Sequence, residues 1–278
     1  MSTPKPVWFV TGASKGMGLE TARAALDAGA RVVATSRDPD RLHEQIGVHE
    51  DRFLAVSMLL TDPADVSRAV STAVDAFGRI DVLVNNAGYS MLGAVEEFTR
   101  DEIRHNFDVN VFGLLELTQQ VLPHMRRQGS GHVINLASIS ADVTGPATGL
   151  YSATKAAVLM LTEALAAETA SLGVHATAVC PGGVRTDFLD SSSSRRAGDE
   201  IADYGTVRSA LHRYDELNHQ QGGDPQLVAQ ALIALSKMEQ PPSRLYLGTD
   251  ALHAIEHKAR TVLDGVRRYR DLSTSIDR

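Results

Sequence analysis

Short apolar stretches alternate with helical segments along most of this chain, and this alternation restricts the possible fold more than any other feature. Seven stretches have the length and composition of buried strands: residues 7–11, 31–37, 53–58, 81–84, 132–136, 174–180 and 244–247. Helical patterns lie between them, up to about residue 28 and near residues 62–77, 99–128, 151–171, 225–236 and 251–270. Strands joined by helices form parallel sheets with right-handed crossovers and helices on both faces. We therefore predict an α/β fold, with a doubly wound parallel sheet of about seven strands in a single domain, residues 1–278.

Length and composition exclude several classes of protein. The chain has 278 residues, of which 43% are hydrophobic and 22% charged, as is ordinary for a globular protein with a core. Its formal net charge of −7 gives no support to a nucleic-acid partner or to binding at an anionic membrane surface. No apolar run approaches the ~20 residues that span a bilayer, and the first six residues are too polar for a signal peptide. Cys180 is the single cysteine, which excludes an internal disulfide, and we expect a cytoplasmic protein.

The first predicted strand leads into a glycine-rich turn. Residues 12–18 read Gly-Ala-Ser-Lys-Gly-Met-Gly and precede a helical pattern. A strand, a glycine turn and a helix N-terminus form a cradle for phosphate, because backbone amides point outward and the helix dipole favours an anion. Glycine is required where the backbone takes a positive φ or approaches a pyrophosphate closely. The spacing differs from the commonest dinucleotide fingerprint, so the turn alone predicts phosphate binding only in general terms.

The end of the second predicted strand bears on the choice between the two nicotinamide dinucleotides. In dinucleotide-binding folds, an acidic residue about 20 positions beyond the glycines binds the 2′-hydroxyl of NAD, whereas an arginine accommodates the 2′-phosphate of NADP. Arg37 stands at this position, and Lys15 within the glycine turn adds a second cation. Asp38 follows directly, so NAD(H) stays possible. We predict NADP(H) in preference to NAD(H).

Tyr151 and Lys155 stand at the start of an alanine-rich helical pattern. Residues four apart lie on one face of a helix, so the phenol and the ammonium point into the same space. A neighbouring positive charge favours the ionised phenol, which predicts a pKa for Tyr151 below the usual value of about 10. Such a group donates or accepts a proton near neutral pH. The same spacing also occurs by chance on helices whose lysine extends to water, so the interpretation depends on the remaining motifs.

Together these motifs resemble the short-chain dehydrogenase/reductase family over almost the full length of the chain. The family motif Thr-Gly-x-x-x-Gly-x-Gly is matched by residues 11–18, and its Asn-Asn-Ala-Gly motif by residues 85–88. Its Pro-Gly segment after the sixth strand is matched by Pro181 and Gly182, with Thr186 shortly beyond. The family's catalytic tetrad is matched by four residues: Asn110, Ser138, Tyr151 and Lys155.

The resemblance implies a Rossmann-type sheet and a role for each matching residue. Tyr151 is expected to be the general acid in ketone reduction and the general base in alcohol oxidation, with Lys155 lowering its pKa and holding the nicotinamide ribose. Ser138 is expected to hydrogen-bond the substrate oxygen, and Asn110 to support a water-linked proton path to Lys155. The residues expected to bind the cofactor are Gly12, Ser14, Lys15, Gly16, Met17, Gly18, Arg37, Asn86, Ala87, Gly88, Tyr151, Lys155, Pro181, Gly182, Val184 and Thr186.

Two features depart from the shorter tetrameric members of this family. Leu59 stands where members often have an aspartate that meets the adenine amine, so we expect adenine binding to use apolar contacts or backbone groups instead. About thirty residues follow the last predicted strand, and we expect a C-terminal helical extension at 249–278. This length resembles the hydroxysteroid- and retinol-dehydrogenase-like branch. We expect a homo-oligomer, either a dimer or a tetramer.

Residues 184–223 interrupt the alternation with a polar segment that is too long for an ordinary connection. A mobile lid over a substrate site and a merely solvated insertion account for it equally well. Residues 91–95 and 143–150 are further candidate walls of the substrate pocket. Four apolar residues in these stretches favour a fairly apolar carbonyl or alcohol substrate: Leu92, Val95, Val143 and Leu189.

The favoured prediction is an NADP(H)-dependent oxidoreductase that interconverts a ketone or aldehyde and an alcohol. One alternative is an NAD-dependent dehydrogenase of a sterol, a polyol or a hydroxy acid. Another is a non-catalytic module that senses a dinucleotide, although such proteins usually lose the tyrosine or the lysine that this chain keeps. Sugar epimerases of the extended family usually lack Asn-Asn-Ala-Gly. No metal is expected, because His253 and His257 form a His-x-x-Glu-His pattern within a charged terminal helix, which we interpret as a solvated face.

Overall fold

The computed structural model describes residues 5–47 and 51–277. Residues 1–4 and Arg278, which begin and end the predicted domain, lie outside the described residues. The strands of the main sheet are β1 (Val7–Thr11), β2 (Arg31–Ser36), β3 (Phe53–Ser57), β4 (Val82–Asn85), β6 (Gly131–Leu136), β7 (Val174–Pro181) and β9 (Arg244–Leu247). They form one seven-stranded sheet in the order β3-β2-β1-β4-β6-β7-β9, and every neighbouring pair is parallel. The predicted α/β fold with a doubly wound parallel sheet is confirmed.

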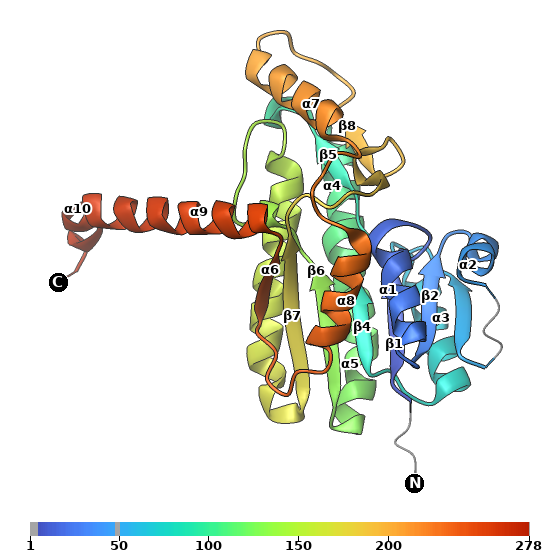
Figure 1. Ribbon diagram of the computed structural model, residues 1–278. Helices are drawn as coiled ribbons and strands as arrows, with labels where there is room; N and C mark the ends of the chain where they lie inside the picture. Colours follow the sequence, from blue (N-terminus) through green and yellow to red (C-terminus); the bar gives the residue numbers. More distant parts are fainter. Residues whose placement is uncertain (1–4, 48–50, 278) are drawn as a thin grey trace.

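Helices cover both faces of this sheet (Figure 1). The α-helices are α1 (Gly16–Asp27), α2 (Pro39–Ile46), α3 (Pro63–Phe77), α4 (Arg100–Phe107), α5 (Leu114–Gln128), α6 (Gly149–Thr169), α7 (Gly205–Leu217), α8 (Pro225–Leu235), α9 (Thr249–Arg268) and α10 (Arg270–Thr274). Short 3-10 helices occupy Val95–Glu97, Ile139–Ala141, Ala170–Leu172 and Asp187–Leu189, and a π-helical turn occupies Asp108–Gly113. Among the residues that the structure describes, no helix is both long and apolar enough to cross a membrane.

Successive residues of the buried strands supply two separate cores, because side chains alternate between the faces of a sheet. Trp8 and Val10 of β1 pack in the cluster that includes Leu26 of α1 and Leu232 of α8. Phe9, between them, packs in a second cluster that contains residues of α3 and α5. Burial on both faces explains why these strands appear in the sequence as continuous apolar runs rather than alternating ones.

The strand order reverses between β1 and β4. The chain runs outward from β1 through β2 to β3 and then returns, so that β4 pairs with the other side of β1. Open α/β sheets bind ligands in the crevice at the carboxyl ends of strands at such a switch point. The glycine turn after β1 and the Asn-Asn-Ala-Gly stretch after β4 both lie there.

Three elements were not predicted from the sequence. Helix α2 fills the connection between β2 and β3, and a separate two-stranded sheet pairs β5 (Ser90–Leu92) with β8 (Ser194–Arg196). Helix α7 lies inside the polar segment 184–223. The start of α2 did have a sequence signal: Asp38 followed by proline has the form of an N-cap followed by the first helical residue, as in α3 and α8.

Candidate active site

The glycine turn lies against the Asn-Asn-Ala-Gly stretch, with little space between the two backbones. A Cβ placed on Gly12 would lie 2.9 Å from the Cα of Ala87, and one placed on Gly18 would lie 2.6 Å from the carbonyl oxygen of Gly12. Gly12 and Gly16 also have φ values of 63° and 57°, in the left-handed region that disfavours other residues. The motif therefore requires glycine both for its turns and for this close approach.

Asn86 holds the glycine turn in place through its side chain. Its amide nitrogen donates to the carbonyl oxygens of Thr11, at 2.9 Å, and Gly12, at 3.1 Å. The hydroxyl of Thr11 accepts hydrogen bonds from the backbone nitrogens of Asn86 and Ala87, both at 3.0 Å. These bonds join the ends of β1 and β4 into one rigid rim, against which a pyrophosphate can be held by backbone amides.

Arg37 and Asp38 differ in what surrounds them at the end of β2. Arg37 is exposed. The Asp38 carboxylate caps α2 by accepting a hydrogen bond from the backbone nitrogen of Arg41, and its backbone nitrogen donates to the hydroxyl of Ser36. Asp38 therefore has a structural role as the N-cap of α2. Leu59, in place of the family's aspartate, is 48% exposed, so it offers an accessible apolar surface.

Tyr151, Lys155 and Ser138 meet beside the carboxyl end of β6. Tyr151 and Lys155 are both buried in the first turns of α6, and the Lys155 ammonium nitrogen lies 5.8 Å from the centre of the Tyr151 ring. The Ser138 hydroxyl lies close enough to the phenol of Tyr151 to lower its pKa, and it also accepts a hydrogen bond from the backbone nitrogen of Ser140. The Lys155 ammonium donates to the carbonyl oxygen of Leu136, at 2.6 Å. The helix spacing predicted for this pair is therefore realised, with Ser138 beside the phenol.

The predicted direction of the Tyr151 pKa shift is wrong for this structure. Burial raises the pKa of Tyr151 above its ordinary value, and the hydrogen bond from Ser138 offsets only part of that effect. Burial also lowers the pKa of Lys155 to about 8. Desolvation disfavours the charged form of each group, and the ammonium points to a backbone carbonyl rather than to the phenolic oxygen. The helix spacing correctly predicted that Tyr151 and Lys155 are neighbours, but it did not predict how burial shifts their pKa values.

Asn110 lies within the π-helical turn that joins α4 and α5. Its side chain is buried; the amide nitrogen donates to the carbonyl oxygen of Tyr89 and to the hydroxyl of Thr154, and the amide oxygen accepts from the backbone nitrogen of Tyr89. A Cβ placed on Gly88 would lie 3.1 Å from the Asn110 amide oxygen and 3.6 Å from the Lys155 ammonium. The structure thus brings Asn110, Gly88 and Lys155 together, and such π-turns are frequent at functional sites.

The Pro-Gly segment at the end of β7 is held by a residue that the sequence analysis missed. Asp250, in the first turn of α9, accepts a hydrogen bond from the backbone nitrogen of Gly183 at 2.7 Å. Its carboxylate also occupies the place that a side chain on Gly182 would need. An aspartate in the first turn of a helix is common because it suits the helix dipole, so its position alone gave no sign of this contact.

The beginning of the 184–223 segment lies over the glycine turn and over Tyr151. A Cβ placed on Gly16 would lie 3.4 Å from the Cβ of Thr186. The Lys15 ammonium donates to the hydroxyl of Ser192 at 2.5 Å, and the rings of Phe188 and Tyr151 are 5.8 Å apart. Lys15 and Thr186 are therefore close to one another, as expected of two residues predicted to bind one cofactor.

The rest of this segment is anchored by a buried carboxylate. Glu97 accepts hydrogen bonds from the backbone nitrogens of Ala94 and Ile201 and pairs with Arg208 of α7. Burial alone would raise the pKa of Glu97, but these partners hold it below its usual value. Glu97 thus attaches residues 201–208 to the body of the protein, and the polar composition of the segment gave no sign of this attachment.

An apolar cluster joins α7 to the body near the predicted pocket walls. It contains Leu92, Ala94, Ala147, Val207, Ala210 and Leu211. Leu92 is buried there. Val95 is 78% exposed, and a Cβ placed on Gly149, at the start of α6, would lie 3.3 Å from its side chain. The expected roles of both residues as pocket walls stay predictions.

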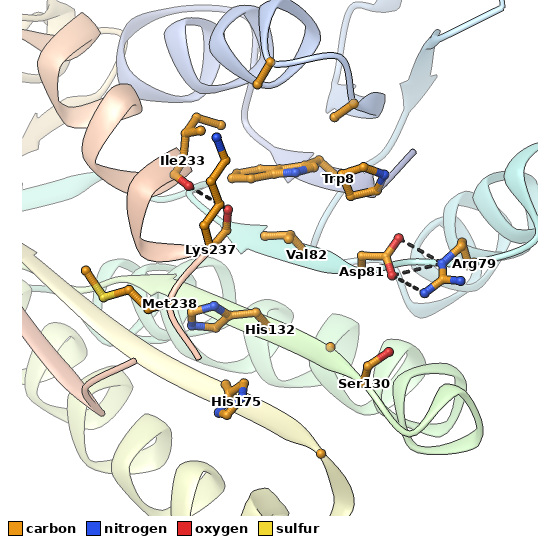
Figure 2. A pocket seen from close by; sticks show the side chains of 16 residues that line it. Trp8, Arg79, Asp81, Val82, Ser130, His132, His175, Ile233, Lys237 and Met238 are labelled. Carbon is orange, nitrogen blue, oxygen red and sulfur yellow. Dashed lines mark hydrogen bonds and ion pairs between the residues drawn. The ribbon is translucent and has the colours of Figure 1, made fainter. Parts of the chain in front are cut away.

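Two further features lie apart from these residues. Within the described part of the chain, Asp187, Asp190 and His219 bring three potential metal-ligand atoms within 4.8 Å, but the Asp190 carboxylate already interacts with Asn218 at 2.7 Å and with His219. A cavity of about 340 Å³ lies at the amino ends of the strands, beside Trp8 and His132 (Figure 2). It is at the opposite end of the sheet from Tyr151 and contains none of the predicted site residues.

The residues at the switch point fit a nicotinamide dinucleotide. The glycine turn keeps side chains away from the place where a pyrophosphate would approach, since Cβ atoms there would meet the backbone of β4 and its own turn. Lys15 lies in the glycine turn, the exposed Arg37 follows β2, and Lys155 lies beside Tyr151 on α6.

Comparisons with known proteins agree with this site. The family model described as short chain dehydrogenase matches residues 6–197. Oxidoreductase BOA17 of Botryotinia fuckeliana is 33% identical over 268 residues, which cover 96% of this chain and 97% of that protein. The 3-ketodihydrosphingosine reductase of Bacteroides thetaiotaomicron is 34% identical over 240 residues, which cover 86% and 87%.

Solved structures extend the match to the whole fold. A short-chain dehydrogenase from Streptomyces avermitilis is 35% identical and superposes with a TM-score of 0.92, covering 99% of this chain and 100% of that one. Among other solved relatives, a 3-ketoacyl-(acyl-carrier-protein) reductase from Brucella melitensis is in complex with NADH, and ElxO has NADP bound. The similar structures therefore include both cofactors. The chain belongs to the short-chain dehydrogenase/reductase family of NAD(P)-dependent oxidoreductases.

Proposed function

We propose that this protein is an NADP(H)-dependent oxidoreductase that interconverts a ketone or aldehyde and an alcohol, with Tyr151 as the acid–base group. One observation carries the proposal: a buried phenol has a serine hydroxyl beside it and a lysine ammonium 5.8 Å from the centre of its ring. A carbonyl oxygen placed between the two hydroxyls would receive a hydrogen bond from each. Donors fixed in this way stabilise the negative charge that grows on that oxygen.

Each residue of the site has a defined task in this proposal. A bound nicotinamide supplies the hydride. Tyr151 donates its proton to the substrate oxygen during reduction, and the raised pKa keeps the phenol protonated until that oxygen becomes basic. Ser138 orients the oxygen. Lys155, with a pKa of about 8, carries its charge in neutral solution and would hold the ribose. Asn110, which lies beside Gly88 as Lys155 does, would support a water-linked proton path to that lysine.

The cofactor would lie along the switch point between β1 and β4. The proposed contacts are those predicted from the sequence, from Gly12, Ser14, Lys15, Gly16, Met17 and Gly18 through Arg37 and residues 86–88 to Pro181, Gly182, Val184 and Thr186. Arg37 favours the 2′-phosphate of NADP because its guanidinium is exposed, while the neighbouring Asp38 is used as a helix cap.

The substrate is proposed to be a fairly apolar carbonyl compound. Tyr214, which packs against the apolar cluster between α7 and the body, lies close enough to Tyr151 to affect its pKa. The relative from Bacteroides thetaiotaomicron is named a 3-ketodihydrosphingosine reductase. The C-terminal helices are compatible with the longer-tailed hydroxysteroid- and retinol-dehydrogenase-like branch. We also propose that residues 184–223 act as a lid, because Thr186, Phe188 and Ser192 contact the glycine turn and Tyr151.

A fluorescence titration of NADPH and NADH tests the cofactor assignment. Wild type is expected to bind NADPH at least about tenfold more tightly, since a phosphate–arginine contact is worth about 1.5–3 kcal/mol. Arg37→Asp is expected to reverse the preference. The matched control is Asp38→Ala, which removes the cap of α2 at a cost of about 1 kcal/mol in stability but should retain the preference for NADPH.

Equal affinities, or a preference for NADH that Arg37→Asp leaves unchanged, would contradict the assignment. That result would favour the NAD-dependent oxidation of a sterol, polyol or hydroxy acid. The outcome for the cofactor is independent of the role of Tyr151, because Arg37 lies at the other end of the site.

A further inference from the structure

Helix α9 leaves the body at the end of β9 and extends away from it as an isolated arm (Figure 1). The helix has 20 residues, which corresponds to a length of roughly 30 Å. Within Thr249–Arg268, every residue of which the structure describes, Ala251 is the single buried one. Of its other residues, Ala254, Ile255 and Gly265 are partly buried and the rest are exposed.

This arm has an apolar stripe that a solvated helix does not need. Val262, Leu263 and Val266 are 50%, 53% and 59% exposed, and Tyr269 at the end of the helix is 54% exposed. Apolar or small residues recur at alternating intervals of three and four, the spacing of a two-helix seam: Leu252, Ile255, Ala259, Val262, Val266 and Tyr269. Exposed apolar surface that is continuous along a helix face indicates an interaction site.

The distribution of charge along the arm favours an antiparallel partner of the same kind. Asp250, Glu256 and Lys258 lie in its first half, whereas its second half and end carry Arg260, Arg267, Arg268 and Arg270 together with Asp264 and Asp271, so that the second half is the more basic one. Two of these arginines also pair within the arm, Arg260 with Glu256 and Arg267 with Asp264. Two copies placed antiparallel would bring the acidic part of each arm beside the basic part of the other. Their helix dipoles would also be opposed, which is the favourable arrangement.

The direction of the arm gives a second reason for the antiparallel arrangement. Because each arm points away from its own body, antiparallel pairing places the two bodies at opposite ends of the helix pair (Figure 1). The end of each arm then reaches the body of the other copy.

We propose that α9 is a dimerisation arm, and that its apolar stripe packs antiparallel against the same stripe of a second copy of this chain. In this register Ala259 of one copy faces Val262 of the other, on either side of the two-fold axis. The root of the arm holds Gly183 through Asp250, so the dimer contact adjoins the predicted cofactor segment. The inference does not rest on the proposed catalytic function.

Disulfide trapping tests the partner and its direction together. Ala259→Cys and Val262→Cys are made as separate full-length variants and oxidised alone and as a mixture. The mixture is expected to give a cross-linked species at about twice the 29.9 kDa of the monomer, because only there do two cysteines face each other. Cys180 is buried and does not interfere. His257→Cys, on the opposite face of the helix, mixed with Val262→Cys is the matched control.

Strong cross-linking of each variant alone would indicate parallel arms and contradict the proposed register. No cross-linking in the mixture above the His257→Cys control would overturn the arm as a dimer contact.

Sedimentation velocity provides a measurement that does not depend on cysteines. The double variant Val262→Glu/Val266→Glu is expected to lose one step of association and to sediment with half the wild-type mass, because it buries charges at the seam. The control His257→Glu/Thr261→Glu adds the same charges to the opposite face and should sediment like wild type. All four positions are exposed, so folding should be retained and can be checked by circular dichroism. A monomeric wild type, or a double variant that keeps the wild-type mass, would contradict the proposal.

Discussion

Tyr151 and Lys155 illustrate how far a motif determines the behaviour of individual residues. Their spacing on a helix places them in one space, and the structure confirms that arrangement. Their charges depend instead on burial, which raises the pKa of Tyr151 and lowers that of Lys155. A tyrosine with a raised pKa stays protonated at neutral pH, so its proton is available for the reductive direction. A dinucleotide bound beside Tyr151 would change the burial of the phenol and the charges around it.

His132 offers a test of the same physics outside the site. Burial lowers the pKa of His132 to about 4, and its ring nitrogen interacts with the hydroxyl of Thr177 at 3.0 Å. The unfolded chain, with an ordinary histidine pKa of 6.5, therefore binds more protons between pH 6.5 and pH 4, and stability falls as the pH falls through that window. The expected loss between pH 7 and pH 5 is about 2 kcal/mol.

Urea unfolding at the two pH values measures this effect. His132→Gln keeps a donor toward Thr177 but cannot be protonated, so about 2 kcal/mol of the difference between pH 7 and pH 5 should disappear. His175→Gln replaces the exposed neighbouring histidine, whose charge is the smaller of the two causes that lower the pKa of His132, and should keep most of the wild-type difference. A His132→Gln protein as acid-sensitive as wild type would show that His132 does not control this transition.

At the scale of elements, the strands and the glycine turn were predictable because local sequence determines them. Buried parallel strands require continuous apolar residues, and the turn requires glycine where Gly12 and Gly16 have a positive φ. The elements within 184–223 were not predictable, because α7 depends on distant contacts. Its apolar residues meet Leu92 and Ala147, and Arg208 meets the buried Glu97.

The anchoring of the proposed lid depends on the pair between Arg208 and Glu97. Arg208→Met is expected to leave the Glu97 carboxylate without its cation and to loosen residues 184–223. Limited chymotryptic cleavage of this segment should become faster by roughly tenfold. A tenfold change corresponds to a decrease of about 1.4 kcal/mol in the free energy needed to open the segment. NADPH affinity should change less than the cleavage rate does, since Arg208 contacts Glu97 and Glu200 rather than Val184 or Thr186, the residues of this segment predicted to bind the cofactor.

Arg213→Met is the matched control for this experiment. Arg213 lies on the exposed side of the same helix, and its replacement should leave cleavage at the wild-type rate. If both variants were cleaved at the wild-type rate, the pair between Arg208 and Glu97 would not hold residues 184–223 closed. That result would contradict the proposed attachment of the lid.

The topology of the whole molecule follows from the order of its elements, but the course of its C-terminus does not. Strands that alternate with helices permit few arrangements other than a doubly wound sheet, and the switch point between β1 and β4 then fixes where the site residues meet. The sequence predicted a C-terminal helix, yet its pattern alone could not show whether α9 covers the body or leaves it. That depends on contacts between surfaces, including those of a second copy.

The central claim is that Tyr151 supplies the proton for carbonyl reduction, and the most direct test is single-site replacement. Tyr151→Phe keeps the ring that packs against Phe188 but removes the proton. With an apolar ketone that wild type reduces, the account predicts a loss of turnover by about 10²–10⁴-fold, with the NADPH dissociation constant within about twofold of wild type. Tyr269→Phe, which removes the same hydroxyl from the surface, should turn over normally. A Tyr151→Phe protein that retained more than about a tenth of the wild-type turnover would contradict the account.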